Sequence, residues 1–198
     1  MYGMQYIQQT IVGIDGSEAR FFGYVADNSE EMEPDRIRPA ILILPGGGYA
    51  MTSDREAEPV ALQFLAKGFA VFVLRYSVAL LEAAEAMRLI RANADQWHVN
   101  PAQVAVLGFS AGGHLAANLA TSVGDEDIRE QGGIDPDAVR PNALMLSYPV
   151  ITAGKCAHRG SFQCLLGDQA HNQALLDKFS IEKHIDAKTP PVFVWHTM

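Results

Sequence analysis

Long apolar runs are missing from this chain of 198 residues. None approaches the ~18 consecutive residues that a membrane-spanning helix needs. The first ten residues, MYGMQYIQQT, also lack the basic stretch followed by an apolar stretch that marks a secretory leader. We therefore expect no membrane partner and a cytoplasmic protein.

Basic residues are scarce relative to acidic ones. Fifteen Lys and Arg stand against 23 Asp and Glu, which gives a formal net charge of −8. Such an acidic surplus repels a phosphate backbone, so nucleic acid is not an expected partner.

Cysteine is rarer still, since the chain has only Cys156 and Cys164. Their spacing matches neither a CxxC pair nor a zinc-binding pattern, so two reduced thiols are expected rather than a disulfide framework. We expect no metal site and no cofactor.

Hydrophobic residues, by contrast, make up 48% of the chain, and charged residues make up 19%. This balance is typical of a folded protein with a sizeable core, and not of a disordered one. The length suits a single domain over residues 1–198 and falls short of the ~250 residues of a (β/α)8 barrel.

Strand and helix patterns alternate along the chain. Residues 7–12 and 20–24 predict an antiparallel hairpin around the turn at Asp15-Gly16. The other expected elements are buried strands at 40–44 and 70–74, further apolar strands at 104–107, 143–146 and 192–195, and helices at 56–67 and about 80–97. The alternation predicts an α/β fold with a mostly parallel sheet, helices on both faces and an antiparallel N-terminal edge.

One serine stands where a catalytic nucleophile is expected. Gly108-Phe109-Ser110-Ala111-Gly112 fits G-x-S-x-G, directly after a predicted strand and at the start of a predicted helix. The glycines remove Cβ atoms that would collide in so sharp a turn, and the helix N-terminus favours developing negative charge. The alternative is a serine that only caps the helix. Its place between strand and helix favours the nucleophile.

A second glycine-rich turn, Pro45-Gly46-Gly47-Gly48-Tyr49, follows the strand at 40–44. Backbone N–H groups can approach an oxyanion closely where side chains are missing, so this loop is a candidate oxyanion hole. A flexible turn is the alternative. Neither glycine run matches G-x-G-x-x-G or ends in Gly-Lys-Ser/Thr, so nucleotide binding is disfavoured.

These motifs resemble the α/β-hydrolase superfamily, and within it the small serine esterases similar to acetylxylan esterases, feruloyl esterases and the lipase-like hormone-sensitive-lipase group. Some members are named sugar hydrolases or xylanases. The likeness runs from about Gln5 to Thr197 and includes the stretches 53–59, 75–77, 108–114, 147–152, 158–161, 165–167 and 195–197. By this resemblance Ser110 is the nucleophile, and the amides of Gly47, Gly48 and Ala111 form the oxyanion hole.

The resemblance also implies a catalytic acid and a histidine, in that order, after the strand at 192–195. Both are expected beyond Met198, so the chain is interpreted as truncated at its C-terminus, with no helix to cover its last strand. The junction at 76–80 also looks shorter than in relatives.

Other histidines in the chain are weaker candidates for the catalytic base. Two internal pairs, Asp168 with His171 and Asp177 with His184, have the right order but lie in a polar, helix-like stretch. Three further histidines are not expected to be the base: His196 before the expected acid is interpreted as structural, His114 as a packing residue or one that supports the site, and His98 as a residue at a helix end.

The expected function is that of a serine carboxylesterase, a carboxylic ester hydrolase for short acyl esters such as acetyl esters of sugars or xylan fragments. An acyl-enzyme would form on Ser110. Two alternatives remain: a serine peptidase of the prolyl-oligopeptidase type, which the short chain disfavours, and a non-catalytic relative that lacks the triad acid and base.

Overall fold

A computed structural model describes residues 3–77 and 79–197, and within them seven strands form one sheet. Val78 lies outside the described residues. It belongs to the junction at 76–80, which looks shorter than in relatives. The strand order is β1-β2-β4-β3-β5-β6-β7. The strands are β1 (Met4–Val12), β2 (Glu18–Ala26), β3 (Arg38–Leu44), β4 (Ala70–Arg75), β5 (Val99–Phe109), β6 (Ala143–Ser147) and β7 (Val192–Trp195).

The N-terminal hairpin forms the antiparallel part of the sheet. β1 pairs with β2 around a turn in which Gly16 has φ 81°, and β2 pairs antiparallel with β4. All pairs from β4 to β7 are parallel. The predicted mostly parallel sheet with an antiparallel edge is therefore confirmed.

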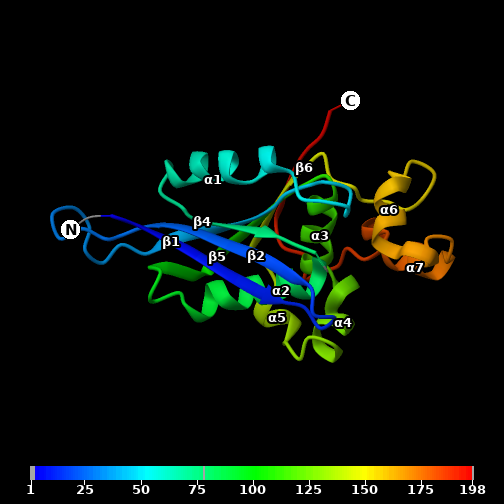
Figure 1. The fold of residues 1–198 in the computed structure, drawn as a ribbon, viewed down its shortest axis with the longest axis horizontal. Coiled ribbons are helices and arrows are strands. Elements are labelled where there is room, and N and C mark those ends of the chain that lie inside the picture. The colour runs from blue at the N-terminus through cyan, green and yellow to red at the C-terminus, as the bar shows by residue number, and fades with distance from the viewer. Residues whose placement is uncertain (1–2, 78, 198) are drawn as a thin grey trace.

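Helices cover both faces of the sheet, as predicted. In Figure 1, α1 lies on one side and α2 and α5 on the other, while α6 and α7 stand together at one end. The helices are α1 (Glu58–Leu65), α2 (Ala79–Ala92), α3 (Ala111–Ala120), α4 (Asp125–Glu130), α5 (Pro136–Val139), α6 (Arg159–Leu166) and α7 (Gln173–Lys178). Short 3-10 turns are η1 (Asp54–Glu56), η2 (Ser122–Gly124), η3 (Gly167–Gln169) and η4 (Ile181–Lys183).

The continuous apolar runs are explained by this double cover. Ile41 and Ile43 of β3 pack on the α1 side, whereas Leu42 and Leu44 belong to the larger core on the side of α2 and α3. Successive residues of a strand point to opposite faces, so a strand buried on both faces must be apolar at every position.

Two predicted helix boundaries were wrong. The helix expected from residue 56 begins at Glu58, because Glu56 instead ends a 3-10 turn. The helix expected to reach residue 97 ends at Ala92. Trp97 is nevertheless buried, because its ring packs 5.2 Å from that of Phe72, so the apolar pattern continued into a turn.

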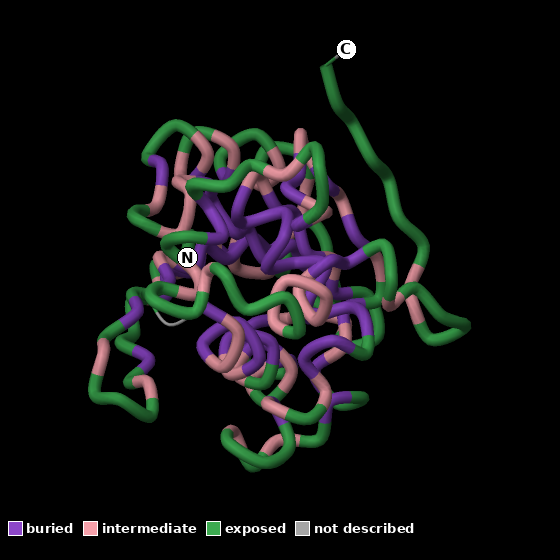
Figure 2. The backbone as a smooth tube through the Cα atoms, turned by 90° about the vertical axis from the view of Figure 1, so that its right-hand side faces the viewer, coloured by how far each residue is buried: buried purple, intermediate pink, exposed green. Residues whose placement is uncertain are grey.

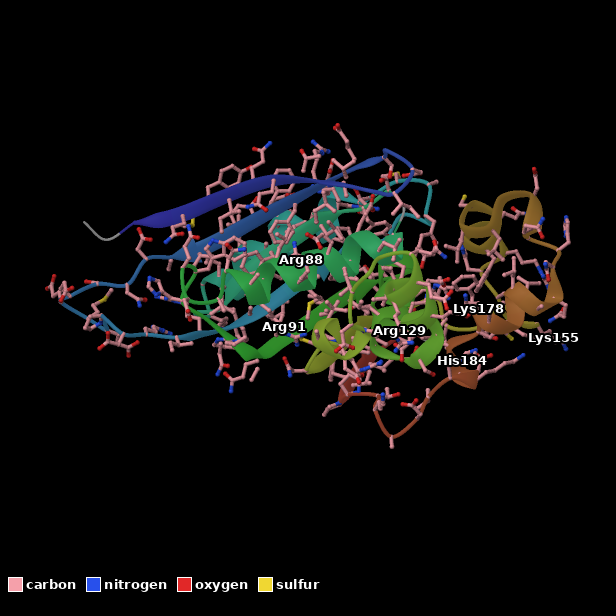
Figure 3. The ribbon with its side chains drawn as sticks, turned by 90° about the horizontal axis from the view of Figure 1, so that it is seen from below. Arg88, Arg91, Arg129, Lys155, Lys178 and His184 are labelled. Carbon is pink, nitrogen blue, oxygen red and sulfur yellow. The ribbon has the colours of Figure 1, made fainter. Side chains whose placement is uncertain are left out.

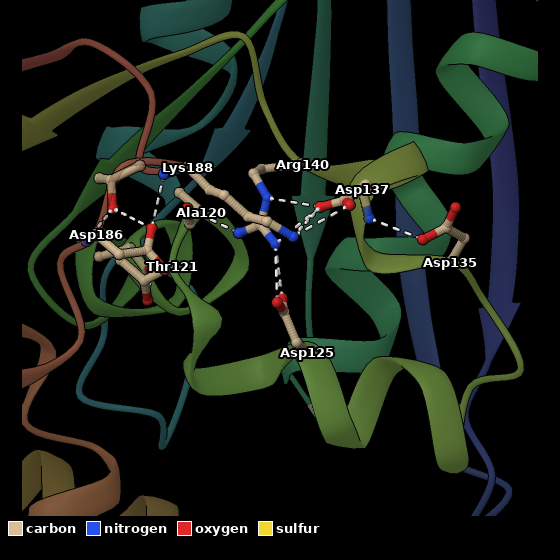
Figure 4. A network of polar contacts seen from close by, with 10 residues as sticks. Ala120, Thr121, Asp125, Asp135, Asp137, Arg140, Asp186 and Lys188 are labelled. Atoms are coloured by element: carbon tan, nitrogen blue, oxygen red, sulfur yellow. Dashed lines mark hydrogen bonds and ion pairs between the residues drawn. The ribbon is translucent and has the colours of Figure 1, made fainter.

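Polar links hold the helices of one face together. Arg140 donates to the carbonyl oxygen of Ala120 at the end of α3 (3.0 Å) and to both carboxylate oxygens of Asp125 in α4 (2.9 Å; Figure 4). Lys178 in α7 reaches Asp127 in α4 at 2.8 Å. Figure 3 places Lys178 beside this region, so α7 is tied to the body of the domain.

The last strand is confirmed, and it is exposed, as expected for a strand that no helix covers. β7 pairs with β6, yet Phe193 is 65% exposed and Val194 56% exposed. Figure 2 shows the same segment as an exposed tube leading to the C-terminus. The strand is apolar on both faces, and among the described residues no helix covers either face.

Candidate active site

Ser110 occupies the sharp turn between β5 and α3 that the sequence predicts. Its backbone has φ 50° and ψ −115°, a strained conformation for a residue with a side chain. The amide donates to the carbonyl oxygen of Ser147 at 3.1 Å, and the Ser110 carbonyl accepts from the amides of His114 and Val150. These bonds fix the strained residue between the ends of β5 and β6.

Glycines around Ser110 are required by backbone contacts. A Cβ on Gly108 would lie 2.4 Å from the Gly112 carbonyl oxygen, and a Cβ on Gly112 would lie 2.1 Å from that of Leu44. Both distances are far shorter than a van der Waals contact allows. The helix can therefore start directly against the end of β3 only without these side chains.

The second glycine turn lies against the nucleophile, as the sequence predicts. A Cβ on Gly46 would lie 2.9 Å from the Ser110 Cβ and 2.8 Å from the Phe109 carbonyl oxygen. Gly47 and Gly48 have φ 139° and 66°. Among the described residues, no acceptor pairs with the amides of Gly47, Gly48 and Ala111. These three amides are therefore unpaired donors in the two turns, and Ala111 directly follows Ser110 in the chain.

Glu56 and Tyr148, which the sequence analysis did not single out, hold this glycine turn. The Gly46 amide donates to Glu56 Oε2 at 2.7 Å, and the Tyr148 hydroxyl donates to Glu56 Oε1 at 2.9 Å. Tyr76 also donates to the Pro45 carbonyl oxygen at 2.7 Å. Glu56 and Tyr148 fall in the stretches 53–59 and 147–152 that resemble esterases. This likeness was the one sequence feature that could have identified them as site residues.

Tyr49 connects the same turn to His114 in α3. The Tyr49 hydroxyl lies 2.7 Å from Nδ1 of His114, and Nε2 lies 2.8 Å from the carbonyl oxygen of Phe179. A carbonyl oxygen can only accept, so Nε2 carries the proton and Nδ1 accepts from Tyr49. Burial lowers the pKa of His114 to about 4, so the ring is neutral near pH 7. The interpretation of His114 as a packing residue is confirmed.

Ser110 opens into a cavity of about 440 Å³. Its wall includes residues 148–152 after β6, together with Cys156, His158, Val194 and His196. His196, interpreted from the sequence as structural, lies on the wall of the nucleophile's cavity. His158, which the sequence analysis did not weigh as a site residue, also lies there.

The internal acid–histidine pairs do not join this site. His171 lies on a separate, smaller cavity with Phe162 and Leu176. The Asp177 carboxylate accepts from Lys183 at 2.5 Å, which lowers the Asp177 pKa. His184, labelled in Figure 3, meets the backbone carbonyl oxygen of Asp177 at 3.2 Å. Neither histidine lies on the wall of the Ser110 cavity.

The cysteines match their expected state, since Cys156 and Cys164 are both free and exposed. Among residues 3–77 and 79–197, no group of three or more His, Cys, Asp or Glu side chains is arranged to hold a metal ion. In the same part of the chain, no helix combines the length and apolarity needed to cross a membrane.

A serine on a strained turn between a parallel strand and a helix, inside a sheet of this order, defines an α/β hydrolase. The chain belongs to the BD-FAE family of that class, whose sequence model matches residues 28–198. It is 33% identical to endo-1,4-beta-xylanase B of Butyrivibrio fibrisolvens, over 89% of this chain and 29% of that protein. It is 31% identical to an acetylxylan esterase of Xylanibacter ruminicola, over 78% of this chain and 32% of the other.

Among solved structures, it resembles an acetyl ester-xyloside bifunctional hydrolase from Caldicellulosiruptor lactoaceticus. The TM-score is 0.76 and the identity 35%, and the match covers 91% of this chain and 66% of that one. The chain thus spans about a third of the length of these two curated relatives.

Proposed function

We propose that this chain carries the nucleophile and oxyanion hole of a serine carboxylesterase for short acyl esters, such as acetyl esters of sugars or xylan fragments. The carrying observation is the strained turn at Ser110, against which Gly46 packs, together with the unpaired amides of Gly47, Gly48 and Ala111 in these two turns. The names of two relatives support the substrate class, because one is an acetylxylan esterase and the other an acetyl ester-xyloside bifunctional hydrolase.

In the proposed reaction, Ser110 Oγ attacks the ester carbonyl carbon while a histidine accepts the hydroxyl proton. The carbonyl oxygen becomes an oxyanion, which the three amides and the N-terminus of α3 stabilise. Collapse of the tetrahedral intermediate expels the alcohol, which takes the proton from the histidine. Water then hydrolyses the acyl-enzyme and regenerates Ser110.

The proposal places the triad acid and histidine beyond Met198, in the order that the family implies. It is supported by the positions of His171 and His184, which lie away from the Ser110 cavity. Removal of triad members from a serine hydrolase leaves a rate only ~10³–10⁴-fold above that in water. Low turnover by residues 1–198 alone is therefore expected.

The test combines hydrolysis with chemical labelling. In a longer protein that carries the relatives' downstream segment, Ser110→Ala should slow the release of p-nitrophenol from p-nitrophenyl acetate by several orders of magnitude, to the residual rate that the oxyanion hole alone supports. A fluorophosphonate probe, mapped by peptide mass spectrometry, should modify Ser110 and leave Ser147 and Ser161 unmodified. Hydrolysis that Ser110→Ala leaves unchanged would refute the proposal. Cleavage of peptide bonds in place of acetyl esters would favour the alternative function of a serine peptidase.

A further inference from the structure

We propose that Glu56 is a positioning residue for the oxyanion hole: with Tyr148 it clamps the glycine turn against the nucleophile. This inference rests on the proposed function, because it assigns the clamp a role in ester hydrolysis. The clamp consists of the Glu56 carboxylate, the Gly46 amide and the Tyr148 hydroxyl.

The two carboxylate oxygens hold different donors. Oε2 accepts from the Gly46 amide at 2.7 Å, and Oε1 accepts from the Tyr148 hydroxyl at 2.9 Å. Hydrogen bonds to an ionised carboxylate are stronger than those between neutral groups. One side chain thus joins the loop after β3 to the loop after β6, across 92 positions of the sequence.

Strand order places the nucleophile between the two clamped loops. β5 lies between β3 and β6, and Ser110 follows directly on β5. The clamp therefore bridges the two neighbours of the nucleophile's strand on the edge of the sheet where the reaction would occur. A clamp at this place limits the separation of the loops on either side of Ser110.

Gly46 transmits this restraint directly. A Cβ placed on Gly46 would lie 2.8 Å from Glu56 Oε2 and 2.9 Å from the Ser110 Cβ, so all three residues share one tightly packed point. The Gly47 amide follows immediately in the chain. A displaced Gly46 would move that donor relative to the oxyanion, and misplacement by ~1 Å is enough to cost about 10²-fold in rate.

Tyr148 has the properties that the clamp needs. Its backbone is strained at φ 38°, and its amide donates to the Trp195 carbonyl oxygen at 2.6 Å. Burial and the nearby Glu56 carboxylate raise the pKa of the Tyr148 phenol to about 12. The hydroxyl therefore remains protonated and can donate near neutral pH. Tyr148 also lies on the wall of the Ser110 cavity.

Two substitutions of Glu56 distinguish a role in positioning the glycine turn from a role of its negative charge in catalysis. In Glu56→Gln, the new amide carbonyl can accept from Gly46, and its NH2 group can donate to the Tyr148 oxygen, so the clamp persists without the charge. In Glu56→Ala both bonds are lost. Glu58→Ala is the matched control, because that carboxylate lies close by in sequence but pairs with Arg75 at 2.5 Å.

The experiment measures p-nitrophenyl acetate hydrolysis and the 1H–15N NMR signal of Gly46 in the same proteins. We expect Glu56→Ala to lower kcat about 10²-fold with little change in KM. Glu56→Gln should stay within about fivefold of the unsubstituted chain, and Glu58→Ala should match it. The Gly46 amide proton should move upfield in Glu56→Ala and not in Glu58→Ala.

The outcomes test the Glu56 clamp and the proposed esterase function separately. An unchanged kcat in Glu56→Ala, or an unmoved Gly46 signal, overturns the clamp. Equal losses in Glu56→Gln and Glu56→Ala overturn positioning in favour of a role for the charge. If the longer protein that carries the relatives' downstream segment hydrolyses no faster than its Ser110→Ala variant, the proposed function fails, while the Gly46 signal still decides whether Glu56 holds the turn.

Discussion

Acidification should destabilise this protein through the buried His114. Its ring is fully buried between Tyr49 and Phe179, and burial disfavours the charged, doubly protonated form. Burial holds the pKa at about 4, compared with 6.5 for an ordinary histidine. The unfolded chain therefore binds more protons than the folded one between these values. The free energy of unfolding should fall as the pH drops from 6.5 to 4, and this histidine's contribution should be constant above and below.

The pKa difference sets the size of this effect. At ~1.4 kcal/mol for each tenfold change in proton affinity, it corresponds to about 3 kcal/mol, a large part of the ~5–15 kcal/mol that stabilises a domain. Urea unfolding at pH 7, 5.5 and 4 measures it, with His114→Gln as the control that cannot titrate. We expect the unsubstituted chain to lose about 3 kcal/mol more than the control. Parallel losses in the two proteins would show that His114 is not the cause.

Three further outcomes are expected. Gly112→Ala should destabilise the fold by ~3 kcal/mol or more in urea unfolding, because its Cβ would lie 2.1 Å from a carbonyl oxygen. Gly160→Ala, whose Cβ would have its nearest neighbour at 3.6 Å, should leave stability unchanged or raise it by up to ~1 kcal/mol. A longer protein that carries the downstream segment of the relatives should gain thermal stability and esterase turnover together; full turnover by residues 1–198 that His171→Ala or His184→Ala abolishes would contradict this.

Local patterns carried most of the successful predictions. The strand before Ser110 and the glycines around it are consecutive in the sequence, so their geometry follows from a short motif. The hairpin around Gly16 is predictable for the same reason. Continuous apolar runs predicted strands covered on both faces, and β3 has this cover.

Features that depend on strand order could not be predicted. Glu56 and Tyr148 are 92 positions apart, and they meet only because β3 and β6 flank β5. The predicted end of α2 was wrong because Trp97 is buried although it lies in a turn, so its apolar character did not indicate a helix.

The glycines near Ser110 have a consequence for how this protein tolerates mutation. At the nucleophile turn, β3, β5 and α3 meet with backbone against backbone, because Gly46, Gly108 and Gly112 leave no side chains between them. Core substitutions elsewhere move side chains. Few side chains contact this junction, so such movements should displace its backbone little. The position of the nucleophile should therefore outlast considerable changes in the core. Core substitutions would then abolish activity by unfolding the protein before they displace Ser110 from its catalytic position.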